Sequence, residues 1–320
     1  MSINEKERTG ADTIDRQAEA AYYDKRKERL LRRRKKQRDR RVKMFAVAAF
    51  FGVSILLFKT AAAWDFPEES DPPEVTAVVA APKETKKTAA KATKETKKEE
   101  DPRESAAWKK IFDNPSLYPE DLLKDLERNT ELLDFVAAYP TTEAKATGGF
   151  TETEKKADTP LFLQWDSRWG YAPYGSSNIA VSGCGPTCLS MVLFSLTRNE
   201  SLTPNMLADR AMQEGYYVSG VGTSWSFMAN LAPQYGVTVN QMEVVDQENM
   251  KRVLRDGSMI ICAMGPGDFT DAGHFIVLKG VEGEKLLIND PFSKANTEKK
   301  WEYDTIVSQS RQMWIYTKNQ

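Results

Sequence analysis

Only the C-terminal half of this 320-residue chain has apolar side chains in the number and spacing that a packed domain needs, and this unevenness limits what the chain can fold into. Within residues 158–320, a nearly all-apolar run after Pro186 predicts a buried helix. Further helices are expected at 204–214, 224–231 and 246–254, and strands at 238–245, 259–264, 275–279, 285–289 and 312–317. Because the predicted helices mostly precede the strands, we expect an α+β domain with a mainly antiparallel sheet.

A basic stretch followed by an apolar one near the N-terminus predicts a membrane anchor. Residues 25–43 contain thirteen Lys or Arg and two acidic residues, directly before an apolar segment that extends to Trp64. Residues 44–64 match the roughly 20 residues that span a bilayer, so we expect a single transmembrane signal anchor there. The basic flank should stay cytoplasmic, which makes residues 1–43 a cytoplasmic tail and places the rest of the chain outside the cell membrane, in a type II arrangement.

The basic stretch has two other interpretations. Nucleic-acid binding is not expected, because the stretch adjoins an apolar segment that makes it a membrane flank. A cleaved signal peptide stays open, since residues 61–63 resemble a cleavage site, although the basic region would be more than forty residues long.

Between the anchor and the C-terminal domain, polar stretches alternate with a helical segment. Residues 65–103 are rich in Pro, Glu, Lys, Thr and Ala and predict a disordered linker. In residues 104–140 apolar side chains return at helical spacing, and helices this short need a partner surface. We expect this segment to dock on the C-terminal domain, either as a structural brace or as an inhibitory pro-segment. Residues 141–156 are polar again and predict a second linker or an exposed loop.

The chain has one histidine and three cysteines, so any thiol chemistry has a single candidate base. Cys184 comes directly before the predicted buried helix, where unpaired amides and the helix dipole favour thiolate over thiol. Its neighbours Gly183 and Gly185 would let a substrate backbone approach closely. The alternative is a tight turn with a small buried thiol. His274, the single imidazole, is the side chain suited to hold a thiolate near neutral pH.

A predicted hairpin links His274 to a carboxylate. Two predicted strands flank a short turn that contains glycine, and a hairpin centred on Glu282 places His274 directly opposite Asp290. Asp290 would then orient the imidazole. A register slip of one residue would put Asn289 in that place instead.

A thiolate that attacks a carbonyl also needs a donor for the oxyanion. Gln164, twenty residues before Cys184, carries a side-chain amide that could supply it, although a glutamine between apolar residues can also be an exposed strand residue. One histidine and scattered thiols make no metal-ligand set, so no metal and no cofactor are expected.

Together these residues resemble a known family. The motifs are Gln-Trp-Asp-x-Arg-Trp-Gly at 164–170, Tyr-Gly at 174–175, Ser-Gly-Cys-Gly-Pro-Thr at 182–187, Gly-His-Phe-Ile-Val-Leu at 273–278 and Asn-Asp-Pro at 289–291. They are similar to those of the bacterial papain-like cysteine peptidases related to the bacteriocin-leader-processing peptidases, cysteine peptidase family thirty-nine. The resemblance covers 158–320 and implies a papain-like fold, in which the helix that carries the cysteine packs on the sheet.

The resemblance implies Cys184 as nucleophile, His274 as general base and acid, Asp290 as orienter and Gln164 as oxyanion donor. The founding members process leaders beside ABC transporters, but no Walker motif is present here, so the chemistry transfers and the substrate does not. We expect a membrane-anchored extracytoplasmic peptidase acting on peptides or on the cell-wall peptide stem. The alternatives are a catalytically silent surface binding or scaffold domain, or an acyl transferase or cell-wall amidase.

Overall fold

The computed structural model describes residues 101–242 and 246–319. The predicted cytoplasmic tail (1–43), the predicted signal anchor (44–64) and most of the predicted linker (65–103) lie outside these residues. The last residues of that linker are described and form a short 3₁₀ helix, η1 (Pro102–Glu104). No helix in the described part of the chain is both long enough and apolar enough to cross a membrane.

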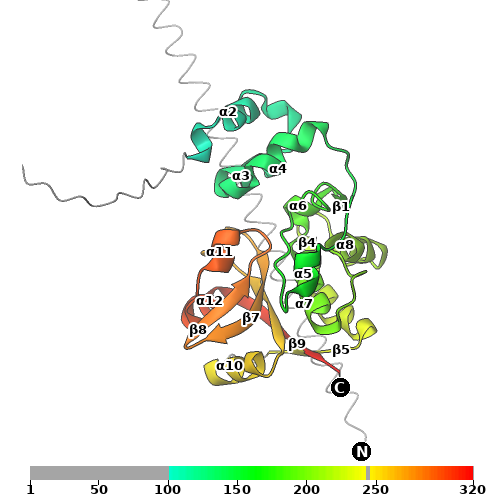
Figure 1. The fold of residues 1–320 in the computed structure, drawn as a ribbon, viewed down its shortest axis with the longest axis vertical. Helices are drawn as coiled ribbons and strands as arrows, with labels where there is room; N and C mark the ends of the chain where they lie inside the picture. Colours follow the sequence, from blue (N-terminus) through cyan, green and yellow to red (C-terminus); the bar gives the residue numbers. More distant parts are fainter. Residues whose placement is uncertain (1–100, 243–245, 320) are drawn as a thin grey trace, which may run out of the picture. The chain divides into compact units, whose positions relative to one another are not determined.

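The centre of the fold is a five-stranded sheet in which every neighbouring pair of strands is antiparallel (Figure 1). In sheet order, the strands are β5 (Val237–Gln241), β9 (Ser310–Lys318), β6 (Met259–Met264), β7 (His274–Glu282) and β8 (Lys285–Asn289). All five predicted strands are present, and the α+β class with an antiparallel sheet is confirmed. The structure places His274 inside β7, one residue earlier than the predicted start of that strand.

Helices cover both faces of this sheet because its central strands are apolar on both sides. Ile261 of β6 and Val277 of β7 pack with the helix that Cys184 begins, whereas Ile260 and Leu278 pack in a second core. The first face is covered by α7 (Cys184–Thr197), with α8 (Pro204–Gln213) and α9 (Trp225–Asn230) beside it, and the second by α10 (Gln247–Arg255) and α12 (Tyr303–Gln309). Burial between the sheet and α8 explains why α7 is apolar almost all round.

The hairpin of β7 and β8 has a different register from the predicted one. Its two-residue turn follows Glu282, and Gly283 occupies it with φ at +59°, a conformation that glycine adopts readily. Beside the turn Gly280 pairs with Leu287, but farther along the strands Leu278 pairs with Ile288, so Lys279 is an extra residue that forms a β-bulge.

This bulge decides which side chain of β8 shares a face with His274. If Lys279 were paired in the ladder and not bulged, the register beside the turn would continue and Asn289 would lie on the His274 face of the sheet. With the bulge, Asn289 pairs with Val277, and Asp290 follows on the opposite face, the one that includes His274. The prediction that His274 lies directly opposite Asp290 is wrong by two residues, an even number that keeps both side chains on one face.

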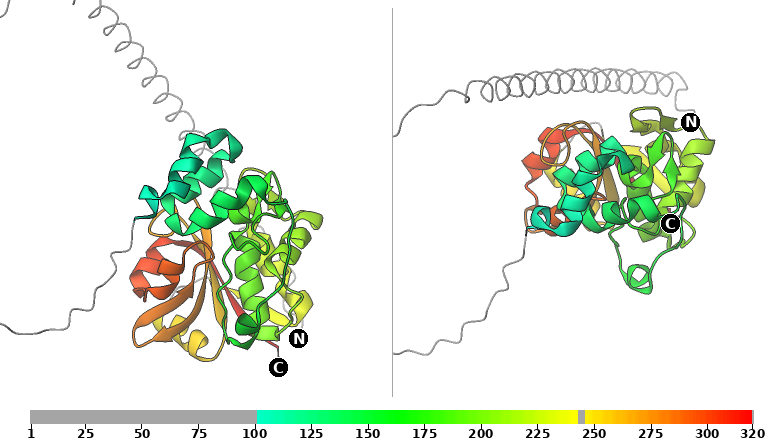
Figure 2. Two further views of the ribbon diagram at one scale, coloured as in Figure 1. Left: turned by 45° about the horizontal axis from the view of Figure 1, so that its top comes forward. Right: turned by 90° about the horizontal axis from the view of Figure 1, so that it is seen from above.

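Residues 104–140, predicted as a helical segment, form short helices whose buried side chains share a core with residues of the C-terminal half. The segment comprises α2 (Ala106–Asp113), α3 (Glu120–Arg128) and α4 (Leu133–Ala138), with the 3₁₀ helices η2 (Pro115–Leu117), η3 (Thr130–Leu132) and η4 (Tyr139–Thr141) between and after them. Leu122, Leu126 and Val136 are fully buried in a third core that also holds Trp165 and Phe292 of the C-terminal half. In both views of Figure 2 these helices, coloured cyan to green, lie grouped together.

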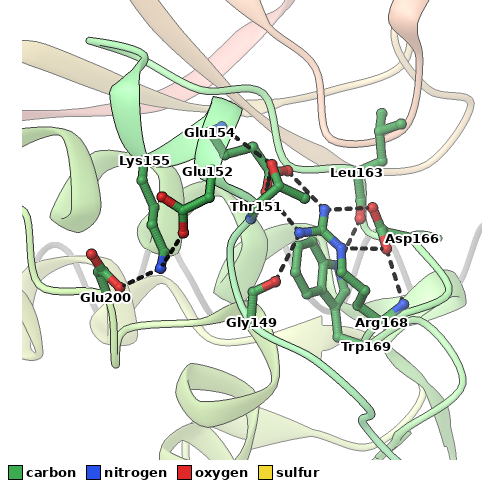
Figure 3. Close-up of polar contacts among 10 residues, drawn as sticks. All are labelled: Gly149, Thr151, Glu152, Glu154, Lys155, Leu163, Asp166, Arg168, Trp169 and Glu200. Carbon is green, nitrogen blue, oxygen red and sulfur yellow. Dashed lines mark hydrogen bonds and ion pairs between the residues drawn. The ribbon is translucent and has the colours of Figure 1, made fainter.

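The second polar stretch, predicted as a linker or loop, is held to the domain by one arginine. Its end forms α5 (Glu152–Lys156), where Thr151 and Glu154 make a capping box. The Arg168 guanidinium donates to both Glu154 oxygens at 2.7 Å, to Asp166 and to the carbonyl of Gly149 (Figure 3). These contacts fix the chain leading to the Gln164 region.

We expect Arg168→Ala to lower the free energy of unfolding by about 3 kcal/mol, because it leaves two partly buried carboxylates without their partner. Side chains here are 21% exposed for Arg168 and 17% for Glu154. The matched control is Arg252→Ala, since Arg252 and Asp256 are 66% and 63% exposed and such pairs contribute about 0.5 kcal/mol. Urea unfolding of both variants measures the difference, and equal losses would contradict the structural role of Arg168.

Candidate active site

His274 and Asp290 form a buried hydrogen-bonded pair. The imidazole Nε2 lies 2.7 Å from Asp290 Oδ1, and the two side chains are 5% and 0% exposed. His274 begins β7, while Asp290 follows the last residue of β8, so the bulged hairpin brings them together. Because Asp290 takes Nε2, the nitrogen that remains for a thiol is Nδ1.

Cys184 is the first residue of α7 and is hydrogen-bonded to His274. Its helix runs for fourteen residues and has no side-chain cap, which leaves its first amides directed at the start of the helix, where the sulfur is. None of the three cysteines is in a disulfide. Cys188 and Cys262 are fully buried, and burial raises the pKa of both thiols, to about 12 for Cys262.

The pKa of His274 is about 9, above its ordinary value of 6.5. Burial acts against the protonated ring, but the charge and hydrogen bond of Asp290 and the contact with Cys184 outweigh it. At neutral pH the ring therefore favours the imidazolium form. An imidazolium beside the sulfur is the partner that stabilises a thiolate.

The glycines on either side of Cys184 have a packing role that differs from the predicted one. A Cβ at Gly183 would lie 2.6 Å from the carbonyl oxygen of Ile179, and one at Gly185 would lie 2.7 Å from Thr223. Both positions face neighbouring protein atoms, so these glycines let α7 pack closely against the elements before and after it.

Gln164 is buried and hydrogen-bonds to two segments of the site, the one before Cys184 and the one after Asp290. Its side-chain Nε2 donates to the carbonyl of Ala180 at 2.6 Å, four residues before Cys184, and its backbone N–H donates to the carbonyl of Pro291 at 2.7 Å. Since Ala180 offers only an acceptor, the amide orientation is fixed and one N–H of Nε2 remains for another acceptor. The alternative of an exposed strand residue is wrong, because Gln164 is 3% exposed.

A family model described as the Peptidase_C39 like family matches residues 156–320. The chain belongs to this family. The matched range contains Gln164, Cys184, His274 and Asp290, and the domain it forms is a cysteine peptidase domain by family.

Two solved structures are similar to half of the chain. One, from Bacillus anthracis, is described as a C39-like peptidase, with 16% identity over 50% of this chain and 95% of that chain and a TM-score of 0.35. The other is the peptidase domain of Streptococcus ComA, a bifunctional ABC transporter of a quorum-sensing pathway, with 18% identity over 50% of this chain and 98% of that chain and a TM-score of 0.34. No curated protein matches the chain.

Residues that sequence reasoning missed hold Asp290 in the C39-like domain. Asn296, in α11 (Lys294–Glu298), donates from Nδ2 to Asp290 Oδ2 at 2.7 Å. The Asp290 backbone N–H donates to Thr297 Oγ1 at 2.9 Å, and the Phe292 N–H donates to Asp290 Oδ1 at 2.9 Å. Each of these hydrogen bonds joins Asp290 to a residue at most seven positions away in the sequence, but no sequence pattern indicated them.

Near Cys184 the C39-like domain also carries the hydroxyl of Tyr174, to which the sequence analysis gave no role beyond the Tyr-Gly motif at 174–175. Tyr174 Oη lies 2.7 Å from Thr223 Oγ1 in the interior, and burial raises the pKa of Tyr174, with the charge of Cys184 acting in the same direction. Tyr174 ends β1 (Pro173–Tyr174), which pairs with β2 (Ser177–Asn178), and Thr223 ends β4 (Gly222–Thr223), which pairs with β3 (Tyr217–Val218). In residues 101–242 and 246–319 no three His, Cys, Asp or Glu side chains are grouped so as to hold a metal ion.

Proposed function

We propose that this chain is a membrane-anchored, extracytoplasmic cysteine peptidase that hydrolyses peptide or amide bonds with Cys184, His274 and Asp290 as its catalytic triad. The observation that supports it most is the hydrogen-bonded series from Cys184 to His274 and from His274 to Asp290. Gln164 is the proposed oxyanion donor, with the backbone N–H of Cys184 beside it.

The first half of the proposed reaction forms an acyl-enzyme. The thiolate of Cys184 attacks the carbonyl carbon, and the electron pair of the C=O bond moves to oxygen, where the remaining N–H of Gln164 donates to it. The imidazolium of His274 then gives its Nδ1 proton to the departing amine, the C–N bond breaks and a thioester remains.

Water completes the reaction. Neutral His274 takes a proton from water, the hydroxide attacks the thioester carbonyl, and the C–S bond breaks to release a carboxylic acid and the thiolate. Asp290 keeps Nε2 protonated throughout and stabilises the imidazolium when it forms. With an amine in place of water the same steps transfer the acyl group, which is the transferase alternative.

The location is proposed from residues 44–64 and the basic residues before them, which predict a type II anchor with the peptidase domain outside the membrane. Peptides and the cell-wall peptide stem are the substrates that such a location offers. The full chain should stay in the membrane pellet after alkaline carbonate washing, and external protease should cut it between residues 65 and 103. Release into the supernatant would contradict the anchor.

The pH dependence of iodoacetamide alkylation at Cys184, read by peptide mass spectrometry on the full chain, tests the proposed chemistry. We expect rapid alkylation well below the free-thiol pKa of about 8.5, because His274 holds the thiolate. Cys188 and Cys262 serve as internal controls that react only after unfolding, since both are buried. Slow alkylation that follows an ordinary thiol titration would contradict the peptidase and favour the silent binding domain.

Product analysis separates the two enzymatic alternatives. With a cleaved peptide and added glycylglycine, a free acid as the product identifies hydrolysis, whereas a new amide identifies acyl transfer. If Cys184 is reactive and the new amide is the only product, the proposed function would be acyl transfer and not hydrolysis.

A further inference from the structure

Asp125 lies on the face of α3 that packs on the C39-like domain. On this helix Leu122 and Leu126 are fully buried, and Asn129, which follows the helix, donates from Nδ2 to the carbonyl of Phe292 at 2.7 Å. Asp125 is one turn from Leu122 and one turn from Asn129, so it shares their face. Asp125 is half-buried, so a partly exposed carboxylate lies beside this mainly apolar docked surface.

The docked face lies between the two parts of the chain that carry the proposed triad. On one side α3 packs against α6 (Ile179–Ser182), which ends two residues before Cys184. On the other side it packs against Phe292, two residues after Asp290, whose ring is 6.2 Å from the His274 ring. The charge of His274 acts on the Asp125 carboxyl, which places that carboxyl within electrostatic reach of the imidazole.

No protein group satisfies this carboxylate. Among residues 101–242 and 246–319, no side chain or backbone N–H donates a hydrogen bond to it, and no Lys, Arg or His forms an ion pair with it. The charged groups around it are Asp121, Lys124 and Arg128 on its own helix and His274 on β7. Burial raises the pKa of Asp125 to about 7, and the nearby Arg128 and His274 only partly offset that effect.

An unpaired carboxylate at this place costs stability. Its folded-state pKa is above the ordinary 3.8, so the folded state is disfavoured once the pH exceeds 3.8, and the cost is complete above about 7. The side chain is half-buried, so water still reaches the carboxylate, but no protein donor replaces the part of its hydration that is lost. Groups with this kind of perturbed ionisation beside a reactive pair are candidates for a role in function.

We propose that Asp125 is a specificity-determining residue that binds an ammonium group carried by the substrate next to the bond attacked by Cys184. This inference rests on the proposed peptidase function and names the kind of substrate for it. A cation supplies the charge and the N–H donors that the carboxylate lacks. In the described part of the chain, Asp125 belongs to no group of three or more His, Cys, Asp or Glu that could hold a metal ion, so its carboxylate suits an ammonium group better.

Charged and neutral thiol reagents of similar size test this on the full chain without a known substrate. Aminoethyl, propyl and sulfonatoethyl methanethiosulfonate are cationic, neutral and anionic. Each transfers its thio group to the Cys184 sulfur as a mixed disulfide and releases methanesulfinate. We expect wild-type Cys184 to prefer the cationic over the neutral reagent. In Asp125→Asn at pH 8 the rate with the cationic reagent divided by the rate with the neutral one should fall about tenfold, because one nearby charge that solvent screens only weakly is lost.

Asp121→Asn is the matched control, because it removes the same charge one turn earlier on the same helix, where the side chain is 65% exposed. We expect it to leave the ratio of rates at the wild-type value. Asp125→Asn should also unfold at a higher temperature than wild type at pH 8, since it removes an ionised carboxylate that lacks a partner. A ratio unchanged in Asp125→Asn, or changed equally in Asp121→Asn, would overturn the proposal.

A second set of probes separates the two sources of an ammonium group in peptides. Nα-acetyl-lysine chloromethyl ketone carries it on the side chain, norleucine chloromethyl ketone carries it on a free N-terminus, and Nα-acetyl-norleucine chloromethyl ketone carries none. Each alkylates a thiolate with loss of chloride. Preference for one cationic probe that disappears in Asp125→Asn identifies the source, and equal rates for all three would overturn the proposal.

The outcomes also separate this proposal from the peptidase itself. If Cys184 reacts rapidly at low pH in wild type and in Asp125→Asn with the same reagent preference, the peptidase stands and Asp125 has no part in recognition. If Cys184 reacts as an ordinary thiol in every protein, the proposed function fails and the Asp125 proposal fails with it.

Discussion

Replacing His274 with alanine is expected to lower the hydrolytic rate of this chain about a thousandfold, because in the proposed reaction the imidazole is both the base for Cys184 and the acid for the leaving amine. Rapid alkylation of Cys184 at low pH should disappear with it. The remaining thiol would titrate near the free value of about 8.5. The single histidine makes this variant unambiguous, since no other imidazole can take its place.

The pH profile of the wild-type protein gives the second half of this test. A pKa of about 9 for His274 means that the imidazolium persists through neutral pH, so hydrolysis should decline only as the pH rises through about 9. The free energy of unfolding should depend on pH through the titration of the same residue, His274. Stabilisation from a raised histidine pKa is complete below 6.5 and is lost as the pH rises through about 9.

Cys188→Ala is the matched control for His274→Ala, because it changes another polar atom one helical turn from Cys184 without touching the series of hydrogen bonds. It should keep the wild-type rate and pH profile. If His274→Ala kept rapid alkylation at low pH, the helix terminus alone would hold the thiolate and His274 would not be the base.

Glu131→Ala is expected to lower kcat about a hundredfold while leaving KM nearly unchanged, because small displacements of a catalytic group carry costs of this size. The Glu131 carboxylate accepts from Ser293 Oγ at 3.1 Å and from the backbone N–H groups of Lys294 at 2.8 Å and Ala295 at 3.2 Å. It therefore fixes the start of α11, the helix that supplies Asn296 to Asp290.

The Glu131 variants are read by steady-state kinetics and by the pH profile. Glu131→Gln retains one acceptor oxygen and should recover part of the lost kcat, a result that a purely structural role would not give. Glu127→Ala, an exposed residue of α3, is the matched control and should behave as wild type. A rise in activity in Glu131→Ala would show instead that the segment 104–140 inhibits the site, the alternative that the sequence left open.

Local patterns in the sequence were sufficient for the strands of the five-stranded sheet and for the helices α7 to α10, but they did not predict α11, α12 or the short strands β1 to β4. The continuous apolar run after Cys184 predicted α7, and the short apolar stretches predicted all five strands of the sheet. The position of Cys184 at a helix start also follows from local sequence, because Pro186 suits a first turn. These features depend on neighbours along the chain, and that is why they could be predicted.

The register of the hairpin could not be obtained from a count of residues. The prediction treated both strands as regular, whereas Lys279 is inserted in the ladder and shifts every pair beyond it. Gly280, an isolated glycine inside a strand pattern, is the signal that could have indicated the bulge. The predicted pairing of His274 with a carboxylate of β8 survived because the total error was even.

The contacts of Glu131 and Asn129 with the loop after Asp290 could not be predicted because they join distant parts of the chain. Glu131 and Ser293 are 162 residues apart, and Asn129 and Phe292 are 163 apart. Composition showed only that the segment 104–140 needed a partner surface. Which loop it would contact depends on three-dimensional packing, which a single sequence without an alignment does not contain.

The bulge at Lys279 has a consequence for how such hairpins can change in evolution. Loss of the one bulged residue would leave a regular ladder with Asp290 still on the His274 face, whereas a change of one residue elsewhere in the ladder would exchange the carboxylate for the amide of Asn289. A gap in this hairpin therefore carries chemical information only together with its position. A difference of one residue between two relatives leaves the site unchanged at the bulge, but outside the bulge it changes the group that orients the histidine, even where every catalytic letter in the two sequences is the same.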